Sequence, residues 1–270
     1  MPAAPAPPRP KRATLAPPAR ALHTPGTMKA IILVAGVSRR LYPLTEYHPK
    51  CLMELGGRTI FDFQMEAIVA AGIRDVCLVV GYRREQIIQH AEQRYPNVRF
   101  TYRINHHFFE TNTAHSLWCA GDEFVNHDFV YLNGDVLFEP KLLARVLESP
   151  HPAALAVEAK RCGEEEVKVI VDDERRIHGI AKTLEPEKCL GEFIGVARFC
   201  APMNAGFYKA LDQLKAEGER NAYFEAALDR IAGEFPLHAV DVTDLPCIEI
   251  DFVADYESAR RNVLTRFGQG

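Results

Sequence analysis

The feature that most constrains this sequence is the alternation of two apolar periodicities between residues 29 and 132. Short apolar runs rich in Val, Ile, Phe and Tyr predict strands at residues 29–34, 75–80, 98–102 and 129–132. Between them, apolar residues at helical spacing predict helices at residues 60–71, 84–94 and 113–120. Strands that alternate with helices build βαβ units, so we expect a doubly wound, largely parallel sheet. Ligands of such sheets bind beyond the carboxyl ends of the strands.

After Pro152 the pattern changes to short strands with few helices between them. These strands are predicted at residues 153–159, 167–171, 177–181 and 193–199. They indicate a small antiparallel insertion, spanning about residues 152–200, that covers one end of the sheet. Helices are then predicted at 204–216 and 223–232, strands at 237–242 and 247–250, and a last helix at 253–266. We therefore expect one mixed α/β domain over residues 28–266.

Residues 1–27 differ from the rest in composition. They hold eight of the eighteen prolines, no acidic residue, and the basic residues Arg9, Lys11, Arg12 and Arg20. A segment with so little apolar surface cannot offset the entropy lost on ordering, so we expect a disordered Pro/Ala-rich tail. It lacks the apolar middle region of a secretory signal.

Composition excludes several classes of protein. With 47% hydrophobic and 25% charged residues the chain is typical of a soluble domain, and it holds no apolar stretch long enough to cross a bilayer. Seven cysteines without a C-x-x-C pair favour free thiols in a reducing cytoplasm. Removing the tail's four positive charges from the net −4 leaves −8 for the remainder, which argues against nucleic acid as a partner.

The turn after the first strand is unusually basic. Gly36 ends the apolar run, and Arg39, Arg40 and Lys50 follow within fifteen residues. Glycine lets backbone N–H groups approach a ligand, and the basic side chains could neutralise a polyphosphate. On its own, the same turn is also typical of a surface loop with solvated bases. It is neither the G-x-G-x-x-G dinucleotide fingerprint nor a G-K-[ST] phosphate loop.

Carboxylates follow two later strands. Asp135 lies in "NGD" at the end of the fourth strand, although such a sequence also favours a plain turn. Glu249 and Asp251 are two residues apart, so both are expected on one face of a short strand. Carboxylates from two strand ends can share a hard cation such as Mg²⁺ with phosphate oxygens.

The segment "LVAGVSRRLYPLTEYHPKCLMELGG" resembles the activation loop of the nucleotidyltransferase family, L-A-A-G-x-G-x-R-L, then P-x-T, then P-K. The positions that match at the family's spacing are Ala35, Gly36, Arg40, Leu41, Pro43, Thr45, Pro49 and Lys50. Two positions depart from it, because Val34 stands for the first alanine and Ser38 for the second glycine. The "GD" and "E-I-D" motifs follow in the family's order, so the resemblance extends over nearly all of residues 28–261.

The resemblance implies a Rossmann-like doubly wound mixed sheet and a role for each motif. Arg40 would stabilise the leaving β- and γ-phosphates, and Lys50 would contact the α-phosphate and the acceptor. Asp135 and Asp251, supported by Glu249, would hold Mg²⁺. The nucleotide would be bound by Val34, Ala35, Gly36, Val37, Ser38, Arg39, Arg40, Asn112, Ser116 and Gly134.

A later segment, "NHHFFETNTAHSLWCAGDEF", is similar to one found in phosphocholine, phosphonate and polyol-phosphate cytidylyltransferases. By that resemblance Asn112 and Ser116 lie near the base and ribose. The acceptor would be bound by Lys50, Lys168, Lys182, Glu192, Tyr223, Phe224 and Glu225. An acidic pocket with aromatic walls would suit a cationic amine, although the last four residues would serve equally well as ordinary core and rim.

The resulting hypothesis is a Mg²⁺-dependent cytidylyltransferase in which an acceptor oxygen attacks the α-phosphorus of CTP and pyrophosphate leaves. Phosphocholine and 2-aminoethylphosphonate are the favoured acceptors, and a sugar-1-phosphate or an inositol phosphate is the alternative. The enzyme would be a cytoplasmic monomer or homodimer with no membrane contact. A catalytically silent nucleotide-binding regulator is a rival, as is a glycosyltransferase, although "NGD" is not the D-x-D motif of the latter. His106, His107, His115 and Cys119 could suggest zinc but lack standard ligand spacing.

Overall fold

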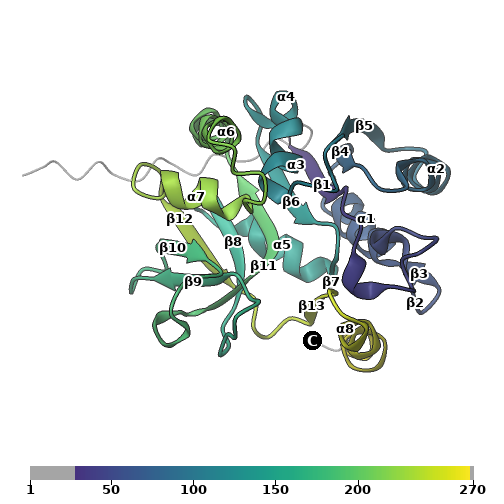
Figure 1. Ribbon diagram of the computed structural model, residues 1–270. Coiled ribbons are helices and arrows are strands. Elements are labelled where there is room, and N and C mark those ends of the chain that lie inside the picture. The colour runs from purple at the N-terminus through teal and green to yellow at the C-terminus, as the bar shows by residue number, and fades with distance from the viewer. Residues whose placement is uncertain (1–27, 268–270) are drawn as a thin grey trace, which may run out of the picture.

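The computed structural model describes residues 28–267, and the predicted tail at 1–27 lies outside the described residues. Within the described part, a nine-stranded sheet runs through the molecule in the order β10-β9-β11-β6-β1-β4-β5, with β8 and β12 attached through β11 (Figure 1). The strands of the first half are β1 (Lys29–Val34), β4 (Asp75–Val80), β5 (Arg99–Ile104) and β6 (Phe129–Asn133). β1 pairs in parallel with both β4 and β6, and β4 pairs in parallel with β5. The predicted α/β fold with a doubly wound mixed sheet is confirmed.

The antiparallel strands of the second half extend this same sheet. They are β8 (Ala153–Glu158), β9 (Lys168–Val171), β10 (Ile177–Ala181) and β11 (Gly191–Phe199), and β12 (Leu237–Asp241) adds in parallel to β8. β11 pairs antiparallel with β6, β8 and β9. Its register shifts between Phe193 and Ala197, around Gly195 with φ 76°. The predicted strands are therefore present, and they are hydrogen-bonded to the parallel half through β11.

Helices cover both faces of the sheet. On one face lie α1 (Ile60–Ala70), α2 (Arg84–Arg94) and α5 (Pro140–Glu148), and on the other α3 (Thr113–Cys119), α4 (Gly121–Phe124), α6 (Ala201–Ala216) and α7 (Glu225–Ile231). Strand β1 supplies both cores, since Ala30 and Ile32 pack against the first set while Ile31 and Leu33 pack against the second. The alternation along the strand thus produces the two layers.

Local sequence signals fix the ends of the predicted helices. Helix α1 begins at a capping box, in which Thr59 Oγ1 accepts from Asp62 N at 3.0 Å and Asp62 Oδ2 accepts from Thr59 N at 2.9 Å. It is followed by Gly72, whose φ of 80° suits glycine. Helix α7 begins at Glu225, two residues later than predicted, and Phe224 N, just before it, donates to Thr113 Oγ1 at 2.9 Å.

The last helix is shorter than predicted. α8 covers only Val253–Ser258, and a π-helical turn (Ala259–Val263) and a 3₁₀ turn (Leu264–Arg266) continue it. This segment packs on a third apolar cluster that includes Leu41, Leu137 and Ile250. The sequence patterns also did not predict α4, α5 or the short strands β2 (Glu54–Leu55), β3 (Arg58–Thr59) and β7 (Val136–Phe138). β7 pairs with β13 (Cys247–Glu249), which brings the late acidic motif to the end of β6.

Candidate active site

Three carboxylates meet at the carboxyl end of β6. Asp135 follows β6 in a tight turn, Glu249 ends β13, and Asp251 lies two residues further. The β7–β13 pairing and a hydrogen bond from Ile250 N to Asp135 O at 3.0 Å hold the two segments together. One oxygen from each carboxylate lies within 4.8 Å of the other two. Among the described residues, the buried Asp135 Oδ1 has no hydrogen-bond partner.

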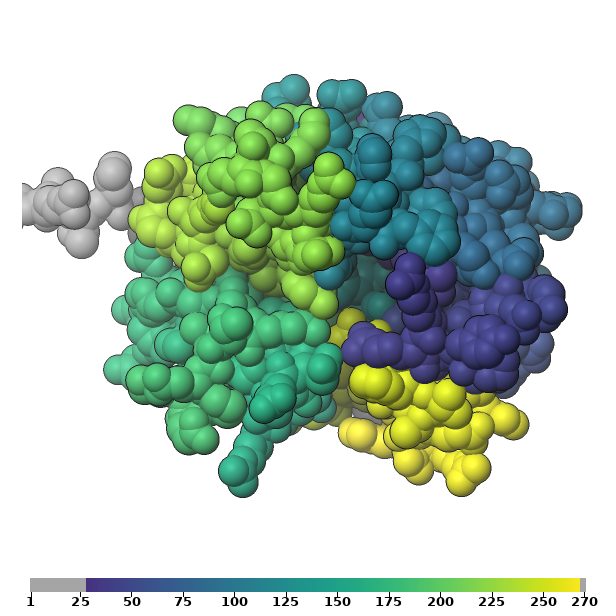
Figure 2. All heavy atoms as spheres, in the orientation of Figure 1, coloured from purple at the N-terminus to yellow at the C-terminus, as the bar shows by residue number. Residues whose placement is uncertain are grey.

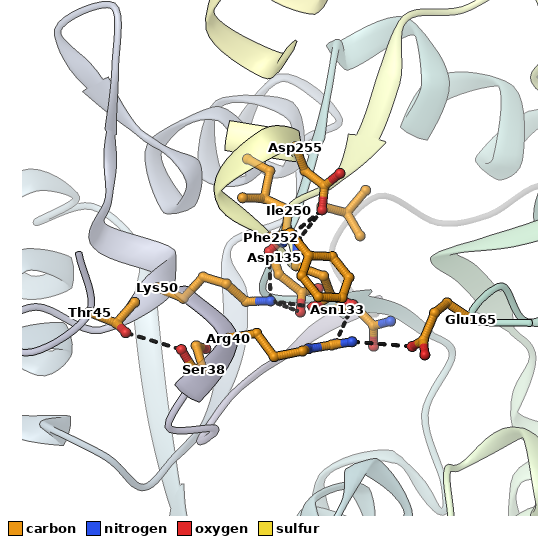
Figure 3. Close-up of polar contacts among 12 residues, drawn as sticks. Ser38, Arg40, Thr45, Lys50, Asn133, Asp135, Glu165, Ile250, Phe252 and Asp255 are labelled. Carbon is orange, nitrogen blue, oxygen red and sulfur yellow. Dashed lines mark hydrogen bonds and ion pairs between the residues drawn. The ribbon is translucent and has the colours of Figure 1, made fainter. Parts of the chain in front are cut away.

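The ammonium of Lys50 lies among these acids (Figure 3). Lys50 begins a 3₁₀ turn (Lys50–Leu52), and its Nζ is 2.8 Å from Asp135 Oδ2 and 2.8 Å from Asp251 Oδ1. Nζ also donates to Ile250 O at 2.7 Å. Burial lowers the pKa of Lys50, but Asp135 and Asp251 outweigh burial and hold the pKa above its ordinary value. Lys50 is therefore charged and pairs with both aspartates.

Arg40 reaches the same cluster from the other end of the loop. Its Nη2 lies 2.6 Å from Asp251 Oδ2, and its Nη1 lies 3.2 Å from Glu165 Oε2 (Figure 3). The guanidinium also lies over the ring of Phe252, 4.6 Å from the centroid. Burial raises the pKa of Asp251, but Lys50 and Arg40 outweigh it and keep the pKa below its usual range.

Glu249 is the least compensated member of the cluster. Burial, with Asp135 and Asp251 nearby, raises its pKa well above the ordinary value. Three clustered carboxyl groups, one with an unpartnered oxygen, form an oxygen donor set that a hard divalent cation would satisfy. The residues present thus fit Mg²⁺.

The loop after β1 forms one wall of a cavity of about 280 Å³. Figure 2 shows the corresponding hollow at the centre of one face, between the purple N-terminal loop and the green second half. Ala35, Gly36, Ser38 and Arg40 line it. Ser38, which stands where the family has glycine, adopts φ 54°, and its carbonyl accepts from Thr45 Oγ1 at 3.0 Å. A serine here thus holds the left-handed conformation that glycine adopts without strain.

Val34, Val37 and Arg39 do not line this cavity. Val34 is buried in β1, and the guanidinium of Arg39 lies 5.5 Å from the ring centroid of Phe109. Of the ten residues expected to bind the nucleotide, these three would act only through the backbone or after a change of rotamer.

Polar side chains from the region before and within α3 form a second wall. Asn112 Oδ1 accepts from Thr113 N at 2.9 Å at the start of α3. Asn105, only 1% exposed, donates from Nδ2 to Ser116 Oγ and Thr111 Oγ1, each at 3.0 Å. Asn112 and Ser116 were expected in this wall. Asn105, Phe108, Thr111 and Asn133 also line the cavity, and the sequence analysis did not single them out.

The opposite wall contains Lys182, Tyr223 and Glu225. Glu225 is 3% exposed, and its Oε2 has no partner among the described residues. Burial raises the pKa of Glu225 to about 7, and the charge of Lys182 opposes that rise. Lys182 Nζ lies 4.8 Å from the ring centroid of Tyr223. A carboxyl group with one unpartnered oxygen therefore faces the cavity beside a lysine and an aromatic ring.

Three residues expected near the acceptor lie elsewhere. Lys168 is 1% exposed and donates to the carbonyls of Glu166 at 3.3 Å and Lys182 at 2.5 Å, so its ammonium is used within the fold. Glu192 Oε2 pairs with Lys160 Nζ at 2.5 Å. Phe224 is fully buried, with its ring centroid 4.0 Å from that of Tyr131. None of the three lines the cavity.

The histidines considered as zinc ligands contact aromatic rings. His107 and His115 are edge to face at 5.8 Å, and His115 stacks on Trp118 at 5.5 Å. The described residues bring three potential metal ligands together at Asp135, Glu249 and Asp251, and this group contains no histidine or cysteine.

A doubly wound sheet that holds a basic loop opposite three carboxylates is the framework of a protein that binds a phosphate-bearing ligand beside a metal ion. The chain belongs to the nucleotidyl transferase family, whose model matches residues 29–166. Within residues 28–267 no helix combines the length and the apolar character needed to cross a bilayer.

The chain is similar to several characterised relatives. It is 27% identical over 253 residues to the CMP-5'-(3-aminopropyl)phosphonate synthase of Streptomyces rubellomurinus, a match covering 89% of this chain and 40% of that protein. It is also 27% identical over 230 residues to the choline-phosphate cytidylyltransferase of Streptococcus pneumoniae, covering 85% of this chain and 95% of the relative. The chain thus spans less than half the length of the first relative. The structure of the inositol-1-phosphate CTP transferase from T. maritima superposes with a TM-score of 0.75 at 21% identity, covering 92% of this chain and 99% of that one.

Proposed function

We propose that the chain is a Mg²⁺-dependent cytidylyltransferase, which joins CTP to a small molecule bearing a phosphate or phosphonate and releases pyrophosphate. The observation that carries this proposal is the meeting of Arg40 and Lys50 with Asp135 and Asp251 at the end of β6. Cations from the loop and acids from two strand ends are the groups needed to bind a triphosphate together with its metal.

The roles follow from the positions of these groups. The backbone around Gly36 and Ser38 cradles the phosphates, and Arg40 neutralises the β- and γ-phosphates as they leave. Lys50, released from its aspartates, holds the α-phosphate and the attacking oxygen of the acceptor in line. Asp135, Glu249 and Asp251 would hold Mg²⁺, which would supply charge neutralisation at the phosphate oxygens when bound. The chain provides positioning and electrostatics, and no covalent intermediate is required.

CTP as the nucleotide is supported by the names of the relatives and by the polar wall at α3. Asn112 and Ser116 lie in that wall with Asn105. Together these side chains offer amide and hydroxyl groups to a base or a ribose. The names of two relatives contain CMP or cytidylyl, and the name of the structural neighbour from T. maritima contains CTP.

We assign the acceptor's cationic head to Glu225 and Tyr223. Within residues 28–267 the buried Glu225 Oε2 has no hydrogen-bond partner, and an ammonium or trimethylammonium group would supply the missing positive charge. Tyr223 is 38% exposed beside it and offers a ring face. Lys182 now lies over that ring, and it would turn to the acceptor's phosphate when the head group binds. Phosphocholine and 2-aminoethylphosphonate have this combination of a cation and an anion.

A neutral polyol phosphate is a second candidate acceptor, favoured by one specific observation. The pKa of Glu225 is raised to about 7, so a large fraction of the carboxyl group is protonated at neutral pH and can donate a hydrogen bond to a hydroxyl. With a polyol acceptor, Lys182 could also remain over Tyr223.

Pyrophosphate release tests the function and separates the two acceptors. CTP, UTP, dTTP and GTP are each combined with phosphocholine, 2-aminoethylphosphonate, inositol 1-phosphate and glucose 1-phosphate, with and without Mg²⁺. We expect the highest kcat/KM for CTP with a cationic acceptor, and none without the metal. Higher activity with another nucleotide would refute the cytidylyl assignment, and no pyrophosphate with any pair would refute the function.

The variant Glu225→Gln tests the acceptor assignment. Removing the charge should raise the KM for a cationic acceptor about tenfold while changing the KM for CTP little, since one buried ion pair contributes on the order of 1–2 kcal/mol. Glu234→Gln is the matched control, because Glu234 is exposed in the same region of the chain and does not line the cavity. Equal use of phosphocholine and inositol 1-phosphate, unaffected by Glu225→Gln, would reject the cationic pocket.

A further inference from the structure

A second cavity of about 250 Å³ is lined by residues of α3 and α6. These two helices are neighbours on the same face of the sheet (Figure 1). The residues that line it are His107, Thr111, Ala114, His115, Leu211, Leu214, Lys215, Gly218, Glu219 and Arg220. Apart from Thr111, none of them lines the cavity to which the reaction is assigned.

The base of this second cavity is apolar. Ala114 is 4% exposed, and Leu211 and Leu214 of α6 are 1% and 3% exposed. The imidazole rings of His107 and His115 meet edge to face at 5.8 Å and add a flat wall. A ring or a short hydrocarbon body would remove this apolar surface from water, whereas a bare inorganic ion would not.

The rim of the cavity is mainly cationic. Lys215 Nζ lies 3.3 Å from the ring centroid of Trp118, and Arg220 Nη1 pairs with Glu110 Oε2 at 2.9 Å. Glu219 is the one acid among the lining residues. Burial lowers the pKa of His115, and the nearby His107, Lys215 and Arg220 lower it further, which is the response expected inside a positive field.

Hydrogen bonds connect this rim to the first cavity. Asn112 N donates to Arg220 O at 3.1 Å, and Ala114 N donates to Ala222 O at 3.2 Å. The segment that carries Arg220 continues directly to Tyr223 and Glu225 in the acceptor wall. A ligand on the rim would therefore contact a backbone segment shared with the proposed active site.

We propose that this second cavity binds a small phosphate monoester with an apolar ring. The ring lies on Ala114, Leu211 and Leu214, and the phosphate is bound by Lys215 and Arg220, the latter exchanging Glu110 for the ligand. The site is distinct from the one that binds the nucleotide and the acceptor, and it does not depend on the proposed reaction.

The chain offers a direct readout, because Trp118 is its single tryptophan and contacts both His115 and Lys215. Phenyl phosphate is titrated into the full chain while the fluorescence of Trp118 is recorded. We expect a saturable change with phenyl phosphate and an affinity at least about tenfold weaker for inorganic phosphate and for phenol.

Variants separate the two cavities. Lys215→Gln combined with Arg220→Gln should lower the affinity for phenyl phosphate at least about tenfold, since both side chains supply positive charge for the phosphate. Lys209→Gln, at an exposed position of α6 outside the cavity, is the matched control. Arg40→Gln, in the first cavity, should leave the affinity unchanged.

The proposal is overturned if phenyl phosphate causes no saturable change, or if the double variant binds it as tightly as the unmodified chain. It is also overturned if Arg40→Gln abolishes binding, since the probe would then lie in the first cavity. Equal affinities for phenyl phosphate and inorganic phosphate would reject the apolar part of the site.

Discussion

Individual charges in the proposed active site are neutralised by one another. Lys50 lies between Asp135 and Asp251, and Arg40 pairs with the remaining oxygen of Asp251. Lys50 and Arg40 therefore neutralise carboxylates that a bound metal ion would otherwise neutralise. Binding of Mg²⁺ and a triphosphate would exchange partners, so that the carboxylates bind the metal while Lys50 and Arg40 bind phosphate.

The first prediction concerns the carboxylates. Asp135→Asn and Asp251→Asn should each lower kcat about a thousandfold, because removing a metal ligand costs several kcal/mol of transition-state stabilisation. Steady-state pyrophosphate release at saturating Mg²⁺ measures the effect. The control is Asp173→Asn, an exposed aspartate distant from the cluster in the sequence. Near-normal kcat in either site variant would mean that the metal site is misplaced.

The second prediction concerns the pH dependence of stability at Glu225. Its pKa in the folded chain is raised to about 7 from 4.5, so between these values the folded state retains a proton that the unfolded state has lost. The group's stabilising effect is complete below pH 4.5 and is lost as the pH rises through 7. Glu225→Gln should therefore stabilise the chain at pH 8 relative to the unmodified chain, by up to about 3 kcal/mol, and much less at pH 5.

Thermal unfolding of both chains at pH 5 and pH 8 measures this difference, with Glu234→Gln as the control. If Glu225→Gln shifts Tm equally at the two pH values, Glu225 does not titrate as described.

At the scale of elements, two turns at the ends of parallel strands hold the site. Gly36 follows β1 with open space around it, since a Cβ built there meets nothing within 4 Å. Gly134 follows β6 in close contact, since its Cβ would lie 2.4 Å from Val34 Cγ1 and 2.5 Å from Leu33 O. One glycine leaves room for a ligand, and the other allows two strand ends to approach.

The third prediction contrasts these glycines. Gly134→Ala should lower the free energy of unfolding by about 2–3 kcal/mol, and with it the Tm, because the backbone must shift. It should also lower the activity, because Asp135 moves with the backbone. Gly36→Ala should leave the Tm unchanged within about 2 °C but raise the KM for CTP, because the added methyl group takes space at the phosphates. Differential scanning calorimetry and steady-state kinetics measure both, with Gly233→Ala as the control at another open position.

The elements show how far sequence patterns determine structure. The predicted strands and helices of the first half are confirmed to within two residues, because apolar periodicity and glycine signals act locally. The antiparallel pairing of β11 with β6 joins residues more than sixty positions apart, and no local pattern specifies such pairing. Helix α5 was not predicted, although Leu142, Leu143 and Val146 have helical spacing after Pro140 at its first turn.

For the candidate site, the motifs indicated both charged and neutral residues in the loop after β1 and at the strand ends. Arg40, Lys50 and Asp135 were named from motifs, and the structure brings them together. Asn105 and Phe108 were not, because whether a polar or aromatic residue after a strand lines a cavity depends on tertiary packing. Lys168 was named through the resemblance, and the fold turns its ammonium to two backbone carbonyls, a placement that the sequence pattern does not indicate.

At the scale of the whole molecule, the three apolar clusters lie on both faces of the sheet and beneath the C-terminal helical segment. The charges of the site lie at the carboxyl end of β6, where Asp135 and Asp251 pair with Lys50 and Arg40, so their neutralisation is separate from any bound metal.

The fourth prediction follows from this separation. Removing divalent metal with EDTA should abolish pyrophosphate release and leave Tm within about 2 °C, since Lys50 and Arg40 already neutralise Asp135 and Asp251. A protein that needs its metal to fold would instead unfold on chelation. In contrast, Lys50→Met should destabilise the chain by about 3–5 kcal/mol, because partly buried carboxylates would lose their partner. A large fall in Tm with EDTA alone would contradict the prediction.

Strand β11 pairs with β8 along one edge, and along the other edge it pairs with β9 near its first residues and with β6 near its last, so backbone hydrogen bonds join the two halves of the sheet. A hinge motion that swung one wall toward the other would have to break these hydrogen bonds. We therefore expect the loop after β1 and the wall that contains Lys182 and Glu225 to keep their separation when substrates bind. We expect substrates to enter and leave through motions of the loops at residues 36–49, 105–112 and 159–167. The rate of these loop motions would then limit the rate of turnover.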